Sequence, residues 1–169
     1  MASLILTLGC SQKQKSPDSK ADIEKALGEA HLGSVNVAQD RDKGVITLSG
    51  DVLAEADKQR AEEVARSISP SFVIANQIGV RPAGVESEAK QVDSSLDTAI
   101  EKNLEAILVG KHLNQDIKYA ATNGVLTLKG EVNSVEKRHE LEQLAASVPN
   151  VKQVVNELQI KELKATSRK

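Results

Sequence analysis

Aromatic side chains are almost absent from this chain of 169 residues. Phe72 and Tyr119 are the only two, and there is no tryptophan. Proteins that bind single-stranded nucleic acids or sugars commonly stack them on several aromatic rings. The composition therefore argues against nucleic-acid binding and against glycan binding.

An excess of charge of one sign is also missing. The chain has 22 basic and 24 acidic residues, which gives a net charge of −2. These charges are spread along the whole sequence, so no domain-wide positive field exists to attract phosphate polymers. A short basic tail closes the chain at residues 162–169, and tails of this kind are normally solvated.

Cysteine occurs once, as Cys10, so the chain cannot form an internal disulfide. Cys10 follows an apolar run at residues 2–9, far shorter than the stretch of about 20 residues that spans a bilayer. The run resembles the end of a bacterial lipoprotein signal, where the cysteine is lipidated and becomes the mature N-terminus. Residues 1–18 are therefore interpreted as a truncated lipoprotein signal with a tether, and Cys10 as the lipidation site.

Two features depart from that signal. Thr7 and Leu8 fit it loosely, and the basic segment that opens a signal peptide is missing. Either the true start lies upstream of Met1 or the run is a frayed apolar terminus. The first interpretation places the protein on the periplasmic side of the cell envelope, anchored to the outer membrane through Cys10.

The clearest feature that is present is an internal repeat. Residues 44–52 recur 80 positions later as residues 124–132, with the pattern Gly-Val-(Ile/Leu)-Thr-Leu-x-Gly-(Asp/Glu)-Val. The same offset aligns residues 76–80 with residues 156–160. A repeat of this kind indicates two copies of one structural module.

The offset changes to 77 upstream of these segments, because Ile23–Leu27 aligns with Ile100–Leu104. We therefore expect about three extra residues in the second copy, near Val109–His112.

Each copy is predicted to contain helix, strand, strand, helix and strand, in that order. The first helix is expected over residues 19–30 and 93–108, and the second over residues 54–69 and 134–147, where Ser134 is a candidate N-cap. The apolar positions expected to face the core from the first helix are Ile23, Leu27 and Ala30 in one copy and Leu96, Ile100, Leu104 and Ile107 in the other.

Glycines punctuate the strands. Gly44 and Gly124 supply the positive φ that a tight hairpin needs, and Gly50 and Gly130 recur in register with them. In the strands that follow the hairpins, Ile46, Leu48, Leu126 and Leu128 should face inward, with Thr47 and Thr127 on the solvent side.

Asn76 and Asn156 stand in phase with the apolar residues of the last strand of each copy, so each places an amide on the apolar face. A buried asparagine must satisfy its donors and acceptors. We expect both side chains to bond to neighbouring backbone and to have a structural role, with ligand binding as the alternative.

These residues resemble the BON domain, on the repeated glycine pattern, the amphipathic helix and the closing Asn-x-(Ile/Leu)-x-(Val/Ile). The resemblance spans residues 19–80 and 93–160. Two copies behind a cysteine are similar to the dual-BON lipoproteins and periplasmic stress proteins of Gram-negative bacteria. The resemblance implies an α+β fold, in which each αββαβ module is a three-stranded mixed sheet with two helices packed on one face. It also implies contact with phospholipid and support of envelope integrity or stress tolerance.

The expected domains follow from the repeat and from Pro82 and Gly84, which favour a linker. They are the signal and tether at 1–18, the first module at 19–81, the linker at 82–92, the second module at 93–161 and the basic tail at 162–169.

No catalytic constellation is visible in the sequence. His31, His112 and His139 lie far apart, and no pair has the spacing of metal ligands. The recurring glycines are explained by turns rather than by a phosphate-binding loop. The sequence therefore predicts a protein that is not an enzyme and that uses no metal and no cofactor.

The first functional hypothesis is binding to a phospholipid membrane surface by the second copy. Residues 107–113 bring apolar side chains next to a lysine and a histidine, which suits a headgroup layer. The candidate contacts are Leu108, Val109, Lys111, His112 and Leu113. The alternative interpretation is a helix end closed by Gly110, with Leu108 and Leu113 simply in the core.

The second hypothesis is a protein-interaction module. A sheet covered by helices on one face leaves its other face and its edge strands available for an envelope protein or for a second copy of the chain, as a homo-oligomer. Val45 and Val125 are expected to face outward and to make that contact.

Overall fold

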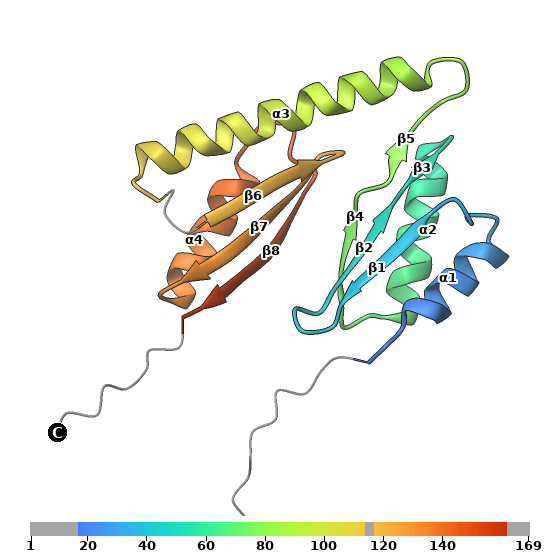
Figure 1. The fold of residues 1–169 in the computed structure, drawn as a ribbon, viewed down its shortest axis with the longest axis horizontal. Helices are drawn as coiled ribbons and strands as arrows, with labels where there is room; N and C mark the ends of the chain where they lie inside the picture. The colour runs from blue at the N-terminus through green and yellow to red at the C-terminus, as the bar shows by residue number, and fades with distance from the viewer. Residues whose placement is uncertain (1–16, 114–116, 162–169) are drawn as a thin grey trace, which may run out of the picture.

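The computed structural model describes residues 17–113 and 117–161, and the repeat is visible as two similar modules (Figure 1). The first module contains α1 (Lys20–Glu29), β1 (Asn36–Asp40), β2 (Val45–Ser49), β3 (Asp51–Val52), α2 (Glu55–Ile68), β4 (Val73–Asn76) and β5 (Gly79–Val80). The second contains α3 (Glu86–Gly110), β6 (Ile117–Thr122), β7 (Val125–Val132), α4 (Val135–Ala146) and β8 (Gln153–Ile160). Cys10 and the basic tail lie outside the described residues.

Each module is a mixed sheet with two helices packed against it, which confirms the expected α+β fold (Figure 1). The strand orders are β1-β2-β4 and β6-β7-β8. In both, the hairpin is antiparallel and the last strand joins in parallel. The parallel pairing requires a crossover, and α2 and α4 provide it.

The strands of the first module are interrupted where those of the second are continuous. Gly50 separates β2 from β3, which pairs with β5. Its φ is 111°, and an added Cβ would lie 2.6 Å from the carbonyl oxygen of Ser34. Gly130 also has a positive φ of 133°, but β7 runs through it. Gly50 therefore lets the backbone at Ser34 come closer than a residue with a side chain would allow.

Each module has its own hydrophobic core between sheet and helices. The predicted inward positions are confirmed, since Ile46, Leu48, Leu126 and Leu128 are all at most 1% exposed. The core residues of the first helices are Ile23 and Leu27 in α1 and Ile100, Leu104 and Leu108 in α3. The expectation that Leu96 belongs to this set is wrong, because Leu96 is 37% exposed and lies N-terminal to the part of α3 that covers the core.

α1 and α3 end in the same way, and in neither is the left-handed residue that follows the helix a glycine. His31 (φ 62°) and His112 (φ 56°) adopt the left-handed conformation just beyond the helices. The amide of Leu113 donates to the carbonyl of Leu108 at 2.8 Å, which is the closing bond of a Schellman motif. Gly110 is the last residue of α3, so the alternative interpretation is wrong in placing the closing left-handed residue at Gly110.

The matching helix ends also correct the alignment of the two copies. Leu27 accepts the closing bond of α1 and therefore corresponds to Leu108, not to Leu104. The difference of four residues is about one helical turn, which leaves the apolar face in phase. The extra residues expected near Val109–His112 do not exist. Instead, the hairpin loop of the first module has four residues and that of the second has two.

The predicted linker is shorter than expected. Residues 86–92 form the first turns of α3, since Glu86, Ala89 and Lys90 are good helix formers. Pro82 and Gly84 remain outside the helix, and Gly84 has a positive φ of 87°.

The open faces of the two sheets pack against each other. Val45, Ala75, Val125 and Val155 form a third buried cluster, with exposures of 4% or less. The expectation that Val45 and Val125 face outward is therefore wrong. Thr127, expected on the solvent side, is 7% exposed for the same reason. Each module covers the face that the other leaves open.

Polar side chains reinforce this contact at the adjacent edge strands β4 and β8. The Gln153 amide nitrogen donates to the carbonyl of Ile74 at 2.7 Å, and its oxygen accepts from the amide of Asn76 at 3.3 Å. Lys43 binds Glu157 at 2.5 Å, and the Glu157 side chain is only 8% exposed. Gln153 thus satisfies backbone groups on an edge that would otherwise be unpaired.

Candidate functional site

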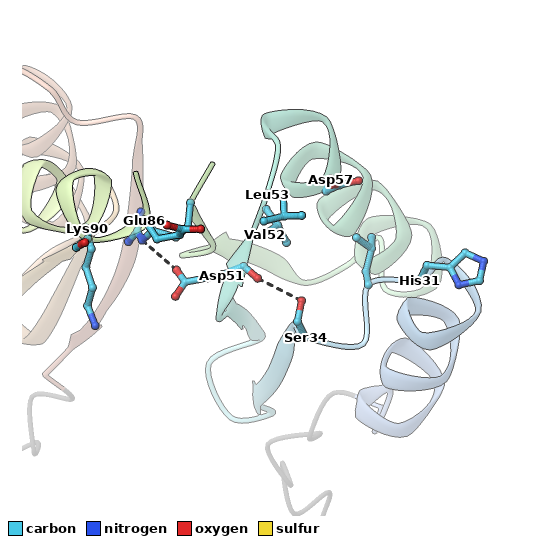
Figure 2. Close-up of a pocket in the computed structure, with 11 residues that line it drawn as sticks. His31, Ser34, Asp51, Val52, Leu53, Asp57, Glu86 and Lys90 are labelled. Carbon is cyan, nitrogen blue, oxygen red and sulfur yellow. Dashed lines mark hydrogen bonds and ion pairs between the residues drawn. The ribbon is translucent and has the colours of Figure 1, made fainter. Parts of the chain in front are cut away.

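Two grooves lie at equivalent places in the two modules. Each forms where the first helix ends in its Schellman motif, the second strand passes its second glycine and the second helix begins. The groove of the first module has a volume of about 730 Å³ (Figure 2). The groove of the second module has a volume of about 250 Å³. Its residues His112, Leu113, Glu131, Val132, Lys137 and Lys161 correspond to His31, Leu32, Asp51, Val52, Asp57 and Arg81 of the first.

An ion-pair network around Arg81 borders the groove of the first module. This side chain is 10% exposed and lies 3.3 Å from Asp51 and 2.5 Å from Asp93. It also donates to the side-chain oxygen of Asn123 at 3.3 Å. Arg81 therefore joins the first module to α3 and to the β6–β7 hairpin, and its charge is neutralised by carboxylates rather than offered to a ligand.

The charges around the two grooves differ in sign. The lining of the first groove also includes the carboxylates of Asp57 and Glu86, with Lys90 as a further cation. Figure 2 shows Leu53 between these polar groups, and it is 66% exposed. The first groove therefore combines an acidic rim with an exposed apolar side chain.

In the second groove Lys137 and Lys161 outnumber the single carboxylate of Glu131. Lys137 binds Glu140 at 3.1 Å at the surface, a type of pair that contributes little. The second groove is the more suitable of the two for an anionic ligand. The repeat offset aligns Lys161 with Arg81, so the sequence contained a signal for this cation that motif analysis missed.

The predicted lipid-contact residues divide into two sets. Leu108 is 1% exposed in the core, and Leu113 packs against the same core. Val109 is 50% exposed, and Lys111 and His112 are exposed beside it. His112 and Leu113 also line the second groove. The surface available to a membrane is therefore Val109, Lys111 and His112 at the rim of a basic groove.

The histidines are not brought together by the fold. His31 and His112 end equivalent helices of different modules, and the ring of His139 on α4 lies 3.0 Å from the side-chain nitrogen of Gln143. Among residues 17–113 and 117–161, no three His, Cys, Asp or Glu side chains are grouped so that they could hold a metal ion.

Asn76 and Asn156 make the same bonds in the two modules. The Asn76 amide nitrogen donates to the carbonyl of Lys58 at 3.1 Å and to Glu62 at 3.0 Å. That of Asn156 donates to the equivalent partners, Arg138 at 3.2 Å and Glu142 at 3.1 Å. Each side-chain oxygen also accepts from the amide two residues later. These bonds tie the last strand to the second helix of its module.

Lys58 lies on the boundary between the modules. It lines a cleft of about 360 Å³ together with Lys152 of the second module, and it is only 8% exposed. Burial lowers the pKa of Lys58 below its ordinary value, and the nearby charge of Lys152 lowers it further. Glu55 and Glu62 oppose the shift but do not cancel it. Lys58 is therefore a poorly solvated cation that has the exposed Lys152 near it.

A membrane-spanning helix is not found in the described part of the chain, where every helix is too short or too polar to cross a bilayer.

Both modules match one known protein family. The family model of the BON domain matches residues 18–82 and 96–162. The chain belongs to the BON domain family. The resemblance in the glycine pattern and in the closing Asn-x-(Ile/Leu) is thereby confirmed. Residues 86–95 of α3 lie between the two BON matches.

Among known proteins, this BON protein is similar to osmotically-inducible protein Y of Escherichia coli (strain K12), with 29% identity over 144 residues. The similarity covers 83% of this chain and 70% of the relative. Two structures of CdsD, a structural protein of the type III secretion system of Chlamydia trachomatis, are also similar. One is its C-terminal domain, with 14% identity and a TM-score of 0.35, covering 88% of this chain and 100% of that one. The other has 14% identity and a TM-score of 0.38, covering 85% and 92%. Scores this low carry no argument about function.

Proposed function

We propose that this BON protein is a non-catalytic protein of the bacterial envelope that binds phospholipid surfaces and supports tolerance of osmotic stress. Membership of the BON family and similarity to an osmotically inducible relative support this assignment. The observation that carries it is the pairing of exposed Val109 and Lys111 with a basic groove in the second module. An apolar side chain can enter the headgroup layer there while the lysines bind phosphate.

Net charge does not contribute to this binding at a distance, because the chain is slightly acidic overall. The contact must therefore depend on local geometry, within about a Debye length of the surface. Each lysine near an anionic membrane contributes about 1 kcal/mol to binding, so a few lysines at one site give only a weak attachment. Lys111 at the rim and Lys137 in the lining of the second groove are placed to contribute in this way.

Liposome sedimentation tests the proposal. Lys111→Glu should weaken binding of the full chain to vesicles containing phosphatidylglycerol by at least about fivefold, since one favourable contact is lost and repulsion replaces it. Lys25→Glu, at a position of α1 whose side chain is 78% exposed, makes the same charge change elsewhere and should leave binding nearly unchanged. Equal losses in both variants would contradict a local site and indicate a response to net charge alone.

A protein partner is the second candidate function, and one observation favours it. The groove of the first module is the larger of the two and carries Leu53 at 66% exposure, between carboxylates. These features suit a basic, apolar segment of an envelope protein better than an anionic lipid. Vesicle-independent capture of such a protein, abolished by Leu53→Asp, would support this candidate.

We also propose anchoring to the outer membrane through a lipidated Cys10. The apolar run before it and the polar segment after it support this proposal. A lipid anchor would keep the modules close to the membrane, where weak contacts are sufficient. Mass spectrometry of the N-terminal peptide, from protein expressed with its native upstream DNA in a Gram-negative host, should show a diacylglycerol-modified Cys10. An unmodified peptide that contains residues on both sides of Cys10 would contradict it.

A further inference from the structure

The N-terminal half of α3, together with Val85 immediately before it, carries an apolar flank, which we define as Val85, Ala89, Val92, Leu96 and Ala99. Ala89 and Ala99 are partly buried, and the other three are exposed. Val85, Val92 and Leu96 are 48%, 58% and 37% exposed. Figure 1 shows this half of α3 extending past the sheet of the second module towards β5. Most of it precedes residue 96, where the second BON match begins, so the flank is not part of the core that the family shares.

The fold uses a different side of this half of α3. Asp93 binds Arg81, and Asp97 accepts from the amides of Asn123 and Gly124 at 2.8 and 2.9 Å. One turn further on, Glu101 accepts from the amide of Ala121 at 2.9 Å. These carboxylates fix α3 against the modules on one side. Among the described residues, the apolar flank on the other side is left largely exposed to solvent.

The spacing of the flank is that of a coiled-coil seam. Its members follow one another at intervals of four, three, four and three residues. Apolar residues at this average interval of 3.5 allow two helices to pack along their length. We propose that the flank is a homodimer interface, in which α3 packs antiparallel against α3 of a second copy of this chain.

Charges beside the flank select the antiparallel orientation. Glu88 and Lys102 occupy equivalent positions on one side of the seam, two heptads apart. An antiparallel pair places Glu88 opposite Lys102 of the second copy, twice by symmetry. A parallel pair would place Glu88 near Asp93 of the second copy, which are like charges. The same register brings the two copies of Asp93 together, but each of these carboxylates already binds Arg81 of its own chain. With two Glu88–Lys102 pairs against this one contact, charge complementarity favours a second copy in the antiparallel orientation.

The seam is short, so the association is weak. Stable interfaces bury about 800 Å² on each partner, and two heptads that include alanines bury less. We expect a dissociation constant on the order of 0.1 mM. The proposal is independent of lipid binding, because Val109 and Lys111 lie near the other end of α3.

Sedimentation equilibrium of the full chain, from about 10 µM to about 1 mM, tests the interface. The wild type should pass from monomer to dimer over this range, and Leu96→Asp should weaken association at least about tenfold. Val135→Asp, at a valine that is 62% exposed on α4, is the matched control and should behave as wild type.

Charge reversal tests the orientation. Glu88→Lys and Lys102→Glu should each weaken the dimer, and the double variant should restore it, because each pair is then reversed rather than broken.

Three results would overturn the proposal: a monomer at every concentration, association unaffected by Leu96→Asp, or a double variant no better than the single ones. If Leu96→Asp instead lowers vesicle sedimentation while the chain stays monomeric, the flank is a membrane contact and not a dimer interface.

Discussion

Among single residues, Lys58 shows an energetic cost of the contact between the modules, because its charge is poorly solvated there. Lys58 is buried in the cleft that it shares with the exposed Lys152, and burial lowers the pKa of Lys58. Between that lowered pKa and the ordinary value of 10.5, the unfolded chain binds more protons at this lysine than the folded chain does. The contribution of Lys58 to stability therefore rises with pH across that window.

Lys58→Met should remove this dependence. The free energy of unfolding at pH 7 should stay the same or rise by up to about 1 kcal/mol, because a poorly solvated charge is replaced by an apolar side chain. The advantage of the variant should shrink as the pH rises through the lowered pKa of Lys58 towards 10.5, because the folded wild type then loses the buried charge. Urea unfolding of both proteins across this pH range measures the difference. A clear loss of stability at pH 7, or a difference independent of pH, would show that Lys58 makes a favourable ion pair instead.

At the scale of elements, the ends of α1 and α3 matter most for the site, because they form one wall of each groove. The left-handed residue is a histidine in both, while Gly110 lies inside the helix with open space around its Cα. A non-glycine residue in the left-handed conformation costs about 1 kcal/mol. The helix ends are therefore under mild backbone strain beside the candidate membrane contact.

Gly110→Ala distinguishes this end from the one that the sequence suggests. In the observed helix, alanine at this position should raise the free energy of unfolding by about 0.5–1 kcal/mol, because glycine is a poor helix former. Chemical denaturation checks the change, with His112→Gly expected to stabilise by a similar amount. If Gly110 adopted the left-handed conformation itself, alanine would destabilise the protein.

Much of the element order could be predicted, and the errors have physical causes. The second helices were predicted to within one residue at each end, because Ser134 is an N-cap whose hydroxyl accepts from the amide of Lys137 and because prolines follow both helices. The copies were misaligned in the first helix because a slip of one turn preserves the apolar face. Only the closing hydrogen bonds at Leu27 and Leu108 reveal the correct match.

The candidate site could be predicted only in part. Residues 107–113 were identified from local composition, but helix periodicity did not separate buried Leu108 from exposed Val109 with certainty. The basic character of the second groove depends on Lys137 and Lys161, which come from other elements and meet Leu113 only in the fold. Local sequence patterns therefore do not predict that these residues lie together.

At the scale of the whole molecule, the two modules form one unit through their open sheet faces. A signal for this was present in the sequence. Val45 and Ile46 are consecutive apolar residues, and so are Val125 and Leu126, which is typical of strands buried on both faces. The expectation of a free face overlooked this pattern. A partner must therefore use the grooves, α3 or the outer edges.

Val125→Asp should separate the modules without destroying their cores. The residue is 2% exposed in the cluster between the sheets, and burying a valine contributes about 1.5–3 kcal/mol. A buried, unpaired carboxylate adds a further penalty. Small-angle X-ray scattering should show a larger radius of gyration than in wild type while circular dichroism stays unchanged. An unchanged radius would contradict the face-to-face packing.

The proposed function places a phospholipid contact on the second module, at the end of α3. Nuclear magnetic resonance of the full chain, titrated with bicelles of phosphatidylcholine alone or with added phosphatidylglycerol, tests it most directly. The amides of Val109, Lys111, His112 and Lys137 should shift or broaden only when the anionic lipid is present. Shifts confined to the first module, or no shift with either lipid, would rule out a phospholipid contact at this end of α3.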